Sequence, residues 1–99
     1  MTPKRTDGNQ ATIAADLRRA GCKVFDTHAL GHGFPDIVVA HAGTDWPDHT
    51  WLFEIKAQGN RARLTPDEAQ FMTDWPGRID IIRSAEDALA IMGLLKEAA

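Results

Sequence analysis

Three charged side chains interrupt two segments that otherwise have the apolar composition of buried β-strands. Asp36 directly precedes Ile-Val-Val-Ala, and Glu54 and Lys56 lie inside the run Trp-Leu-Phe-Glu-Ile-Lys. A carboxylate in such surroundings is normally neutralised, paired or bound to a metal, because an isolated charge is costly to remove from water. We therefore expect these side chains to converge on one divalent metal ion and to hydrolyse a phosphodiester bond.

The two carboxylates and the lysine would divide this chemistry between them. Mg²⁺ prefers oxygen ligands and usually takes one or two carboxylates together with waters and substrate phosphate. Asp36 and Glu54 supply the carboxylates, and the main-chain carbonyl of Ile55 is a candidate third ligand. Lys56 is expected to orient the attacking water or to meet the charge that develops on the phosphate. Its ammonium would also balance the acidic pair when metal is absent.

Each of the three residues has a simpler interpretation. Asp36 follows Pro35 and would serve equally well as a turn or strand-end residue. Glu54 and Lys56 would form an ion pair on a solvated face of the sheet. Each alternative is commoner than a metal site when taken singly. All three residues lie between apolar neighbours, however. The simpler interpretations must therefore hold for all three at the same time.

Strand geometry decides whether the charged side chains can meet. Side chains alternate between the two faces of a strand, so Glu54 and Lys56 share a face. If their strand pairs antiparallel with Ile37–Ala40 about Asp45, Asp36 lies directly opposite Glu54. Opposed residues share a face with Cβ atoms ~4.5–5.5 Å apart. A shift of one residue would put the carboxylates on opposite faces.

The other elements expected from hydrophobic periodicity would position this hairpin. The fold class is α/β, in the order αβββαβ plus a C-terminal helix, with a mixed four-stranded sheet flanked by helices. The third and fourth strands, joined through a helix, should be parallel. The patterns predict helices at Gly8–Ala20, from Thr65-Pro66 to Pro76-Gly77 and after Ser84, and strands at Cys22–Ala29, Ile37–Ala40, Trp51–Lys56 and Ile79–Ile82.

Local signals support the helices. In the second helix, Thr65 is an N-cap, Pro66 takes the first helical position and Glu68 completes a capping box. The first helix has a comparable signal at Asp7 and Gln10. The first helix is predicted to have a core-facing stripe of Gln10, Ile13 and Leu17, and the last helix a wide apolar face of Ala88, Ile91, Met92 and Leu95.

Composition indicates one domain over residues 1–99, with 1–6 expected to be flexible. A net charge of −3 argues against a protein that coats nucleic acid non-specifically. Over Glu54–Arg63, however, three cations face one anion, a local charge of +2. A polyanion is therefore expected at the loop after Lys56. The single cysteine, Cys22, and the absence of an apolar leader or membrane span favour the cytoplasm.

Three segments together resemble a known family. The glycine turn and Pro-Asp of Gly31–Asp36, the Glu-x-Lys of Glu54–Lys56 and the helix start of Leu64–Phe71 resemble the PD-(D/E)xK nuclease superfamily. Within it, the chain is similar to the small stand-alone VRR-NUC nucleases of phages and prophages. The resemblance spans about Asp7 to Leu89, and it implies the cytoplasm of a bacterial or phage-infected cell.

The resemblance implies a restriction-endonuclease-like core and Mg²⁺- or Mn²⁺-dependent cleavage of DNA, often flapped or branched. By motif position, Asp36 and Glu54 would be the metal-binding acids and Lys56 the catalytic lysine. Many members also carry an acid on the first helix, where this chain has Gln10. An amide can still reach a metal through a water molecule. Alternatively, Gln10 only completes the capping box.

Further contacts and a rival function complete the expectations. Candidate DNA contacts are Arg61, Arg63, Gln70 and His32, with Gln70 alternatively a solvated helix residue. The four histidines match no structural zinc spacing. A homodimer is expected, with the apolar surface of the last helix as one candidate interface. The rival function is a catalytically weak or inactive nuclease-like domain that acts as a branched-DNA-binding or phage accessory protein.

Overall fold

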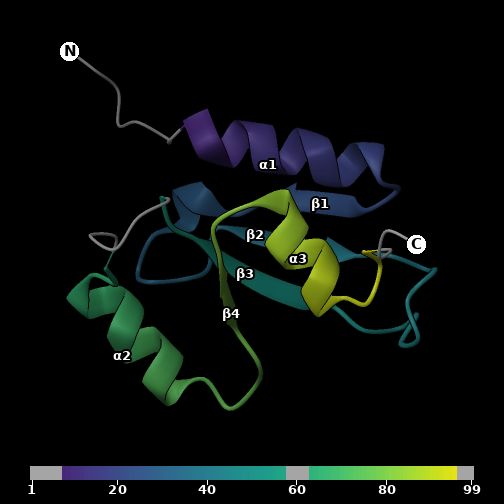
Figure 1. The fold of residues 1–99 in the computed structure, drawn as a ribbon. Coiled ribbons are helices and arrows are strands. Elements are labelled where there is room, and N and C mark those ends of the chain that lie inside the picture. The colour runs from purple at the N-terminus through teal and green to yellow at the C-terminus, as the bar shows by residue number, and fades with distance from the viewer. Residues whose placement is uncertain (1–7, 58–62, 96–99) are drawn as a thin grey trace.

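A four-stranded β-sheet carries the three charged side chains. The computed structural model describes residues 8–57 and 63–95, and within them the strands lie in the order β1-β2-β3-β4 (Figure 1). β4 runs parallel to β3, as expected for a crossover through a helix, and the other neighbours are antiparallel. The strands are β1 (Lys23–Asp26), β2 (Ile37–Ala40), β3 (Trp51–Ile55) and β4 (Asp80–Ile82).

Three α-helices flank the sheet: α1 (Gly8–Arg19), α2 (Pro66–Asp74) and α3 (Ala85–Ile91). α1 and α3 contact each other, whereas α2 stands apart from both of them (Figure 1). The expected α/β class and mixed four-stranded sheet are therefore confirmed. In the described ranges, no helix is both long enough and apolar enough to span a membrane.

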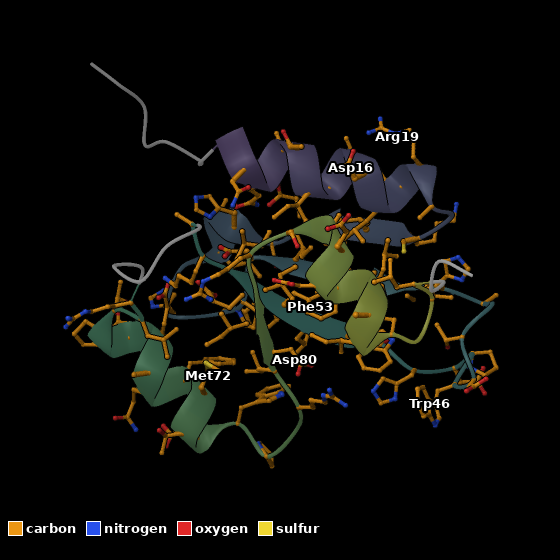
Figure 2. All side chains as sticks on the ribbon, viewed as in Figure 1. Asp16, Arg19, Trp46, Phe53, Met72 and Asp80 are labelled. Atoms are coloured by element: carbon orange, nitrogen blue, oxygen red, sulfur yellow. The ribbon has the colours of Figure 1, made fainter. Side chains whose placement is uncertain are left out.

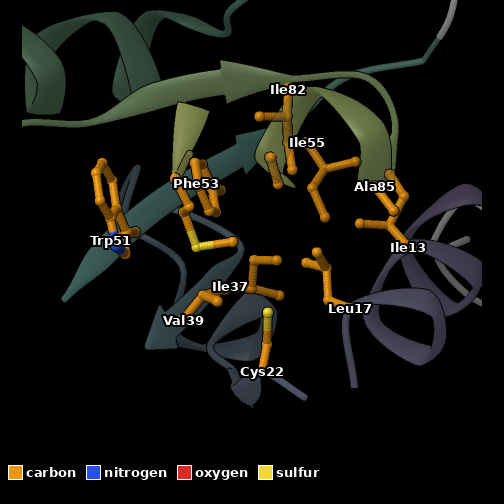
Figure 3. Packing of buried hydrophobic residues seen from close by; sticks show 12 residues of the cluster. Ile13, Leu17, Cys22, Ile37, Val39, Trp51, Phe53, Ile55, Ile82 and Ala85 are labelled. Carbon is orange, nitrogen blue, oxygen red and sulfur yellow. The ribbon is translucent and has the colours of Figure 1, made fainter. Parts of the chain in front are cut away.

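The hydrophobic core lies on one face of the sheet (Figure 3). Alternation along β2 and β3 places Ile37 and Phe53 on this face, and both side chains are 0% exposed. They pack in one cluster with Leu17 of α1 and with Ala88 and Met92 at the C-terminal part of α3. The covered face is therefore the one under α1 and α3, and the alternate strand residues point to the opposite face.

The amphipathic pattern predicted for α1 is confirmed. Gln10, Ile13 and Leu17 are 5%, 2% and 0% exposed, so they form the buried stripe. Figure 2 shows Asp16 and Arg19 on the side of α1 that faces away from the sheet, where they form an ion pair. The helix therefore enters the core along one side only.

The first strand is shorter than predicted. The expected strand Cys22–Ala29 ends at Asp26, and a 3₁₀ helix, η1 (His28–Leu30), follows it. The reason is Thr27, which is 5% exposed and whose hydroxyl donates to the carbonyl of Pro35 at 2.7 Å. This long-range bond anchors Thr27 beside β2, and the chain turns immediately after it.

The last helix is also shorter than predicted. α3 ends at Ile91, and Gly93 follows with φ 77°, a left-handed conformation that ends helices. Leu95 therefore lies outside the helix and is 48% exposed, so its place in the predicted stripe is wrong. Ala88 and Met92 are 0% exposed within the protein's own core. These two residues of α3 and its C-terminal end therefore serve the core, and the use of the remaining apolar residues as an interface stays a prediction.

Helix α2 begins as predicted but packs loosely. The Thr65 hydroxyl accepts from the Glu68 amide at 3.1 Å, and the Glu68 carboxylate accepts from the Thr65 amide at 2.9 Å. None of the residues of α2 is buried. One attachment is the ring of Phe71, which meets Phe34 edge to face with centroids 5.4 Å apart. Phe34 belongs to the segment that leads into Asp36, so α2 lies near the charged residues.

Candidate active site

The pairing of β2 with β3 has the predicted register. Val38 lies opposite Leu52, the pair expected from a hairpin centred on Asp45. At the end of the ladder, the Asp36 amide donates to the Phe53 carbonyl at 3.0 Å. If the regular pairing of β2 with β3 continued, Glu54 would lie opposite Asp36. The bond from Asp36 to Phe53 shows that the pairing is irregular at this end. An irregularity of this kind changes the direction of a side chain at the end of a strand pair.

The Asp36 carboxylate is held at both oxygens. Its Oδ2 accepts from the amide of Ile55 at 2.8 Å, and its Oδ1 lies 3.1 Å from Nδ1 of His28. The side chain is 13% exposed. Asp36 is therefore more than a turn residue, because it joins β2 to the part of β3 that follows Glu54. Coordination of an ion by the Ile55 carbonyl stays a prediction.

Glu54 and Lys56 lie together on the face of β3 opposite the core. The Lys56 ammonium is 3.5 Å from Oε2 of Glu54, and the two side chains are only 15% and 4% exposed. The simpler interpretation is therefore right about the contact of Glu54 with Lys56 and wrong about the solvated face. Removing these charges from water is costly unless further partners compensate.

The compensating partner is Glu68, the residue predicted only as part of a capping box. Its Oε1 accepts from the Lys56 ammonium at 2.7 Å, which is shorter than the distance from Lys56 to Glu54. Lys56 therefore bridges a carboxylate of β3 and a carboxylate of α2. The sequence carries a signal for the helix start but none for this tertiary contact.

Burial and repulsion strongly perturb Glu54. Removal from water, followed by the negative charge of Asp36, raises the pKa of Glu54 to about 9 from its ordinary 4.5. A hydrogen bond with Glu68 and the charge of Glu68 add to the increase, and Lys56 opposes it. At neutral pH and without a cation, Glu54 therefore keeps its proton.

Lys56 and Glu68 are perturbed in the directions expected for an ion pair. Burial would lower the pKa of Lys56, but the hydrogen bond and charge of Glu68, together with Glu54, outweigh it, and this pKa is raised. Burial would raise the pKa of Glu68, but the hydrogen bonds from Lys56 and from the Thr65 amide outweigh it, and this pKa is lowered. Both groups are therefore charged near neutral pH.

His28 is the histidine that contacts the acidic residues. The sequence singled out His32, as a candidate DNA contact, and gave His28 no role. The register of β1 with β2, which pairs Asp26 with Ile37, brings the residues after β1 beside Asp36. His28 then reaches the Asp36 carboxylate from η1. Only the 3₁₀ turn gives it that direction, so the strand pattern could not reveal it.

Gln10 does not reach Asp36 or Glu54 directly. Its side-chain nitrogen donates to Oδ1 of Asp26 at 3.3 Å, and the same oxygen accepts from the His28 amide at 2.9 Å. Gln10 is thus linked to Asp36 only through Asp26 and His28. The predicted N-cap, Asp7, lies outside the described residues. Contact of Gln10 with a metal through water stays a prediction.

Three of the four candidate DNA contacts are described, and they lie on or near helix α2. Arg61 lies outside the described residues, and Arg63 is exposed just before α2. The side-chain nitrogen of Gln70 donates to the Asp74 carboxylate at 3.0 Å, so the amide is engaged along the helix surface. His32 and Gln70 line a cavity of about 360 Å³ with Phe71 and others of α2. Their contact with DNA stays a prediction.

The donor set fits a hard divalent cation that is completed by other oxygens. Within the described ranges, no three His, Cys, Asp or Glu side chains converge closely enough to hold an ion by themselves. Asp36 and Glu54 nevertheless repel each other, as the raised pKa of Glu54 records. Two carboxylates with waters and substrate phosphate are the usual Mg²⁺ arrangement. A cation at this pair would take the place of the proton on Glu54.

Comparison of the chain with protein-family models, with curated proteins and with solved structures finds no match in any of the three. The chemistry of the site therefore rests on its own donors, charges and geometry.

Proposed function

We propose that this protein is a divalent-metal-dependent DNA endonuclease with a restriction-endonuclease-like core, acting on flapped or branched DNA. The observation that carries the proposal is the meeting of Asp36, Glu54 and Lys56 in one largely buried cluster. The resemblance of the Pro-Asp, Glu-x-Lys and Leu-Thr-Pro segments to the VRR-NUC nucleases supports the same conclusion.

The residues would act in distinct ways. Asp36 and Glu54 would hold Mg²⁺ or Mn²⁺, which when bound supplies charge neutralisation and Lewis acidity at the phosphate. The Lys56 ammonium lies 3.5 Å from Glu54 and carries a positive charge, so it would stabilise the negative charge that develops on the phosphate. The Asp36 carboxylate is preoriented by the Ile55 amide and by His28. Such preorientation lowers the reorganisation needed when substrate binds.

The test is cleavage of supercoiled, flapped and four-way DNA with Mg²⁺, Mn²⁺ or EDTA. We expect cleavage with either metal and none with EDTA. Asp36→Asn and Glu54→Gln should each lower kcat by at least ~100-fold, because each removes a carboxylate charge from the metal pair. Asp45→Asn removes an exposed charge from the loop between β2 and β3 and should leave kcat unchanged.

Folding of each variant is checked by circular dichroism before the comparison. If folded Asp36→Asn and Glu54→Gln cut as fast as the wild type, the site is wrongly assigned. If no DNA geometry is cut under any metal condition, the proposed activity is wrong.

One observation favours the rival function, a nuclease-like domain that binds branched DNA without cutting it. The buried amide of Gln10 contacts Asp26 and adds no negative charge at the metal pair. The rival predicts binding of branched DNA in gel-shift experiments without metal-dependent turnover. Turnover that depends on Glu54 would eliminate it.

A further inference from the structure

We propose that Glu68 is a positioning residue of the nuclease site, holding the Lys56 ammonium so that it faces the reacting phosphate and leaves Glu54 to the metal. This inference rests on the proposed function. Its starting observation is that Lys56 lies 2.7 Å from Glu68 but 3.5 Å from Glu54. Lys56, which directly follows β3, is thus held more closely by Glu68 of α2 than by Glu54 of β3.

A lysine needs such a partner to act reproducibly. Its ammonium ends a flexible four-carbon stem, which loses rotamer entropy when it is ordered. Among the described residues, Glu54 and Glu68 are the carboxylates in ion-pair contact with Lys56. Without Glu68, the ammonium would turn to Glu54 and compete with the metal for that carboxylate. Glu68 would therefore keep the Lys56 ammonium apart from the positive charge of the metal ion.

Glu68 is itself fixed by the start of α2. The same Oε1 that meets Lys56 also accepts from the Thr65 amide at 2.9 Å, and the Glu68 amide donates to the Thr65 hydroxyl. The Thr65 backbone amide, which does not depend on the Thr65 side chain, therefore holds the carboxylate in one direction. A side chain that is only 20% exposed is also shielded from competing water.

The helix start is in turn attached beside Asp36. A Cβ built on Gly33 would lie 2.2 Å from the carbonyl oxygen of Asp67, so the backbone of the glycine turn touches the first turn of α2. The edge-to-face contact of Phe34 with Phe71 adds a second attachment. The segment that carries Asp36 and the helix that carries Glu68 thus form one frame around Lys56.

The variants separate the positioning role from the capping role. Glu68→Gln keeps a capping-box side chain, because Gln serves at this position as well as Glu, but removes the charge that holds Lys56. Thr65→Ala removes the cap hydroxyl and keeps the Glu68 carboxylate. Asp67→Asn is the matched control, because it removes one negative charge from an exposed side chain in the same helical turn.

We expect Glu68→Gln to lower kcat by about 10- to 100-fold with KM for DNA changed by less than ~3-fold, because only an orientation used in the transition state is lost. Thr65→Ala should lower Tm by about 4–8 °C and leave kcat within ~3-fold at a temperature where it is folded. Asp67→Asn should change neither. Glu68→Asp should be less active than the wild type but more active than Glu68→Ala.

A second readout does not depend on activity. The Lys56 ammonium should give a slowly exchanging ¹H–¹⁵N signal in the wild type, assigned by its loss in Lys56→Gln. The signal should keep its chemical shift in Thr65→Ala and Asp67→Asn and change its shift in Glu68→Gln, because the ammonium then moves to Glu54. Mn²⁺ affinity, measured by calorimetry, should fall in Glu68→Gln as Lys56 turns toward Glu54.

The outcomes decide between the two proposals. If the wild type cuts DNA and Glu68→Gln retains both kcat and the chemical shift of the Lys56 signal, the positioning role is overturned. If kcat falls but the signal and Mn²⁺ affinity are unchanged, Glu68 acts otherwise than by holding Lys56, and the inference is also wrong. If the wild type does not cut DNA, the proposed function fails and the catalytic role fails with it. The signal then still reports whether Glu68 holds the ammonium.

Discussion

At the scale of single residues, the site combines four ionisable groups, of which three are acids and one is a lysine. Glu54 and Glu68 meet one ammonium, that of Lys56, in largely buried surroundings, and the negative charge of Asp36 acts on Glu54. The excess of negative charge is relieved by a proton on Glu54, whose pKa is raised to about 9. A divalent cation would relieve it more completely, because it brings two positive charges to the same place.

This balance predicts how the free energy of unfolding depends on pH in the metal-free protein. Between pH 4.5, the ordinary pKa of Glu54, and about 9, its pKa in the folded protein, the unfolded chain loses this proton while the folded chain keeps it. Stability should therefore fall as pH rises, by at most about 1.4 kcal/mol per pH unit from this group. Glu54→Gln should remove that slope and be more stable than wild type at pH 8.

Urea unfolding in EDTA at several pH values between 5 and 8 measures the slope. Glu86→Gln, which changes an exposed glutamate of α3, is the matched control and should keep the slope of the wild type. Equal slopes in Glu54→Gln and the wild type would show that Glu54 is ionised in the folded protein.

Lys56 provides a second prediction at this scale. Lys56→Gln removes the ammonium that carries the proposed charge stabilisation and leaves Glu68 without its ion-pair partner. We expect kcat to fall at least ~100-fold, with DNA binding in the presence of Ca²⁺ changed little. Lys23→Gln, an exposed lysine on β1, is the control. A large loss of DNA affinity with unchanged kcat would assign Lys56 to binding instead.

At the scale of elements, the decisive feature is how α2 is attached. None of its residues is buried, so it depends on a few contacts with the turn of Gly31–Gly33 and with Phe34. The three residues of the turn have positive φ values of 71°, 58° and 82°. A turn of this shape lets its backbone lie against the Asp67 carbonyl, which a side chain at Gly33 would prevent.

The two glycines of the turn make a matched pair of substitutions. Both have positive φ, so replacement by Ala strains the backbone at each, by about 1–2 kcal/mol. Only at Gly33 would the new Cβ overlap with Asp67, whereas none of the described atoms lies within 4 Å of a Cβ at Gly31. We expect Gly33→Ala to lose more stability than Gly31→Ala and, because α2 must shift, to lose kcat as well.

Thermal unfolding and cleavage rates of the two proteins test this pair. Equal losses of Tm and kcat would mean that the contact of the turn with α2 contributes nothing beyond the backbone strain common to both positions.

At the scale of the whole molecule, the two faces of the sheet differ. α1 and α3 cover one face with a fully buried core, and the other carries the charged cluster under the start of α2. Phe25 and Ile81 on this second face are 71% and 39% exposed. The second face is therefore less completely covered than the first.

Metal binding should stabilise the whole fold, since a ligand that binds only the folded state raises the free energy of unfolding. Millimolar Mn²⁺ should raise Tm of the wild type, and EDTA should reverse the rise. Asp36→Asn should lose the effect, and Asp45→Asn should keep it. A rise that is the same in all three proteins would indicate binding away from the proposed pair.

The predicted homodimer is a separate question at this scale. Ala88 and Met92 of the predicted apolar face lie inside the core, whereas Leu95 is 48% exposed, and an interface at this end of the chain stays a prediction. Sedimentation at micromolar concentration should still give about twice the monomer mass of 10.9 kDa, since one small subunit offers only a short surface to DNA. A monomer mass would refute the dimer.

Some of the fold and of the site could be predicted from local patterns alone. Alternating apolar residues specify which face of a strand is buried, and this fixes the hairpin register that brings Asp36 near Glu54. The start of α2 was equally predictable, because Thr65 and Glu68 bond within one turn. Both features depend on residues close in sequence or on strict alternation.

Tertiary structure alone decided the rest. The crossover that joins β3 to β4 determines strand direction but not where α2 lies, so the contact of Lys56 with Glu68 has no signal in the sequence. The direction of His28 toward Asp36 depends on a 3₁₀ turn set by a distant hydrogen bond of Thr27. These side chains meet because tertiary packing brings together segments that no repeating pattern in the sequence relates to each other. The sequence by itself therefore determined the acidic pair and its lysine, and the fold determined the glutamate that holds that lysine.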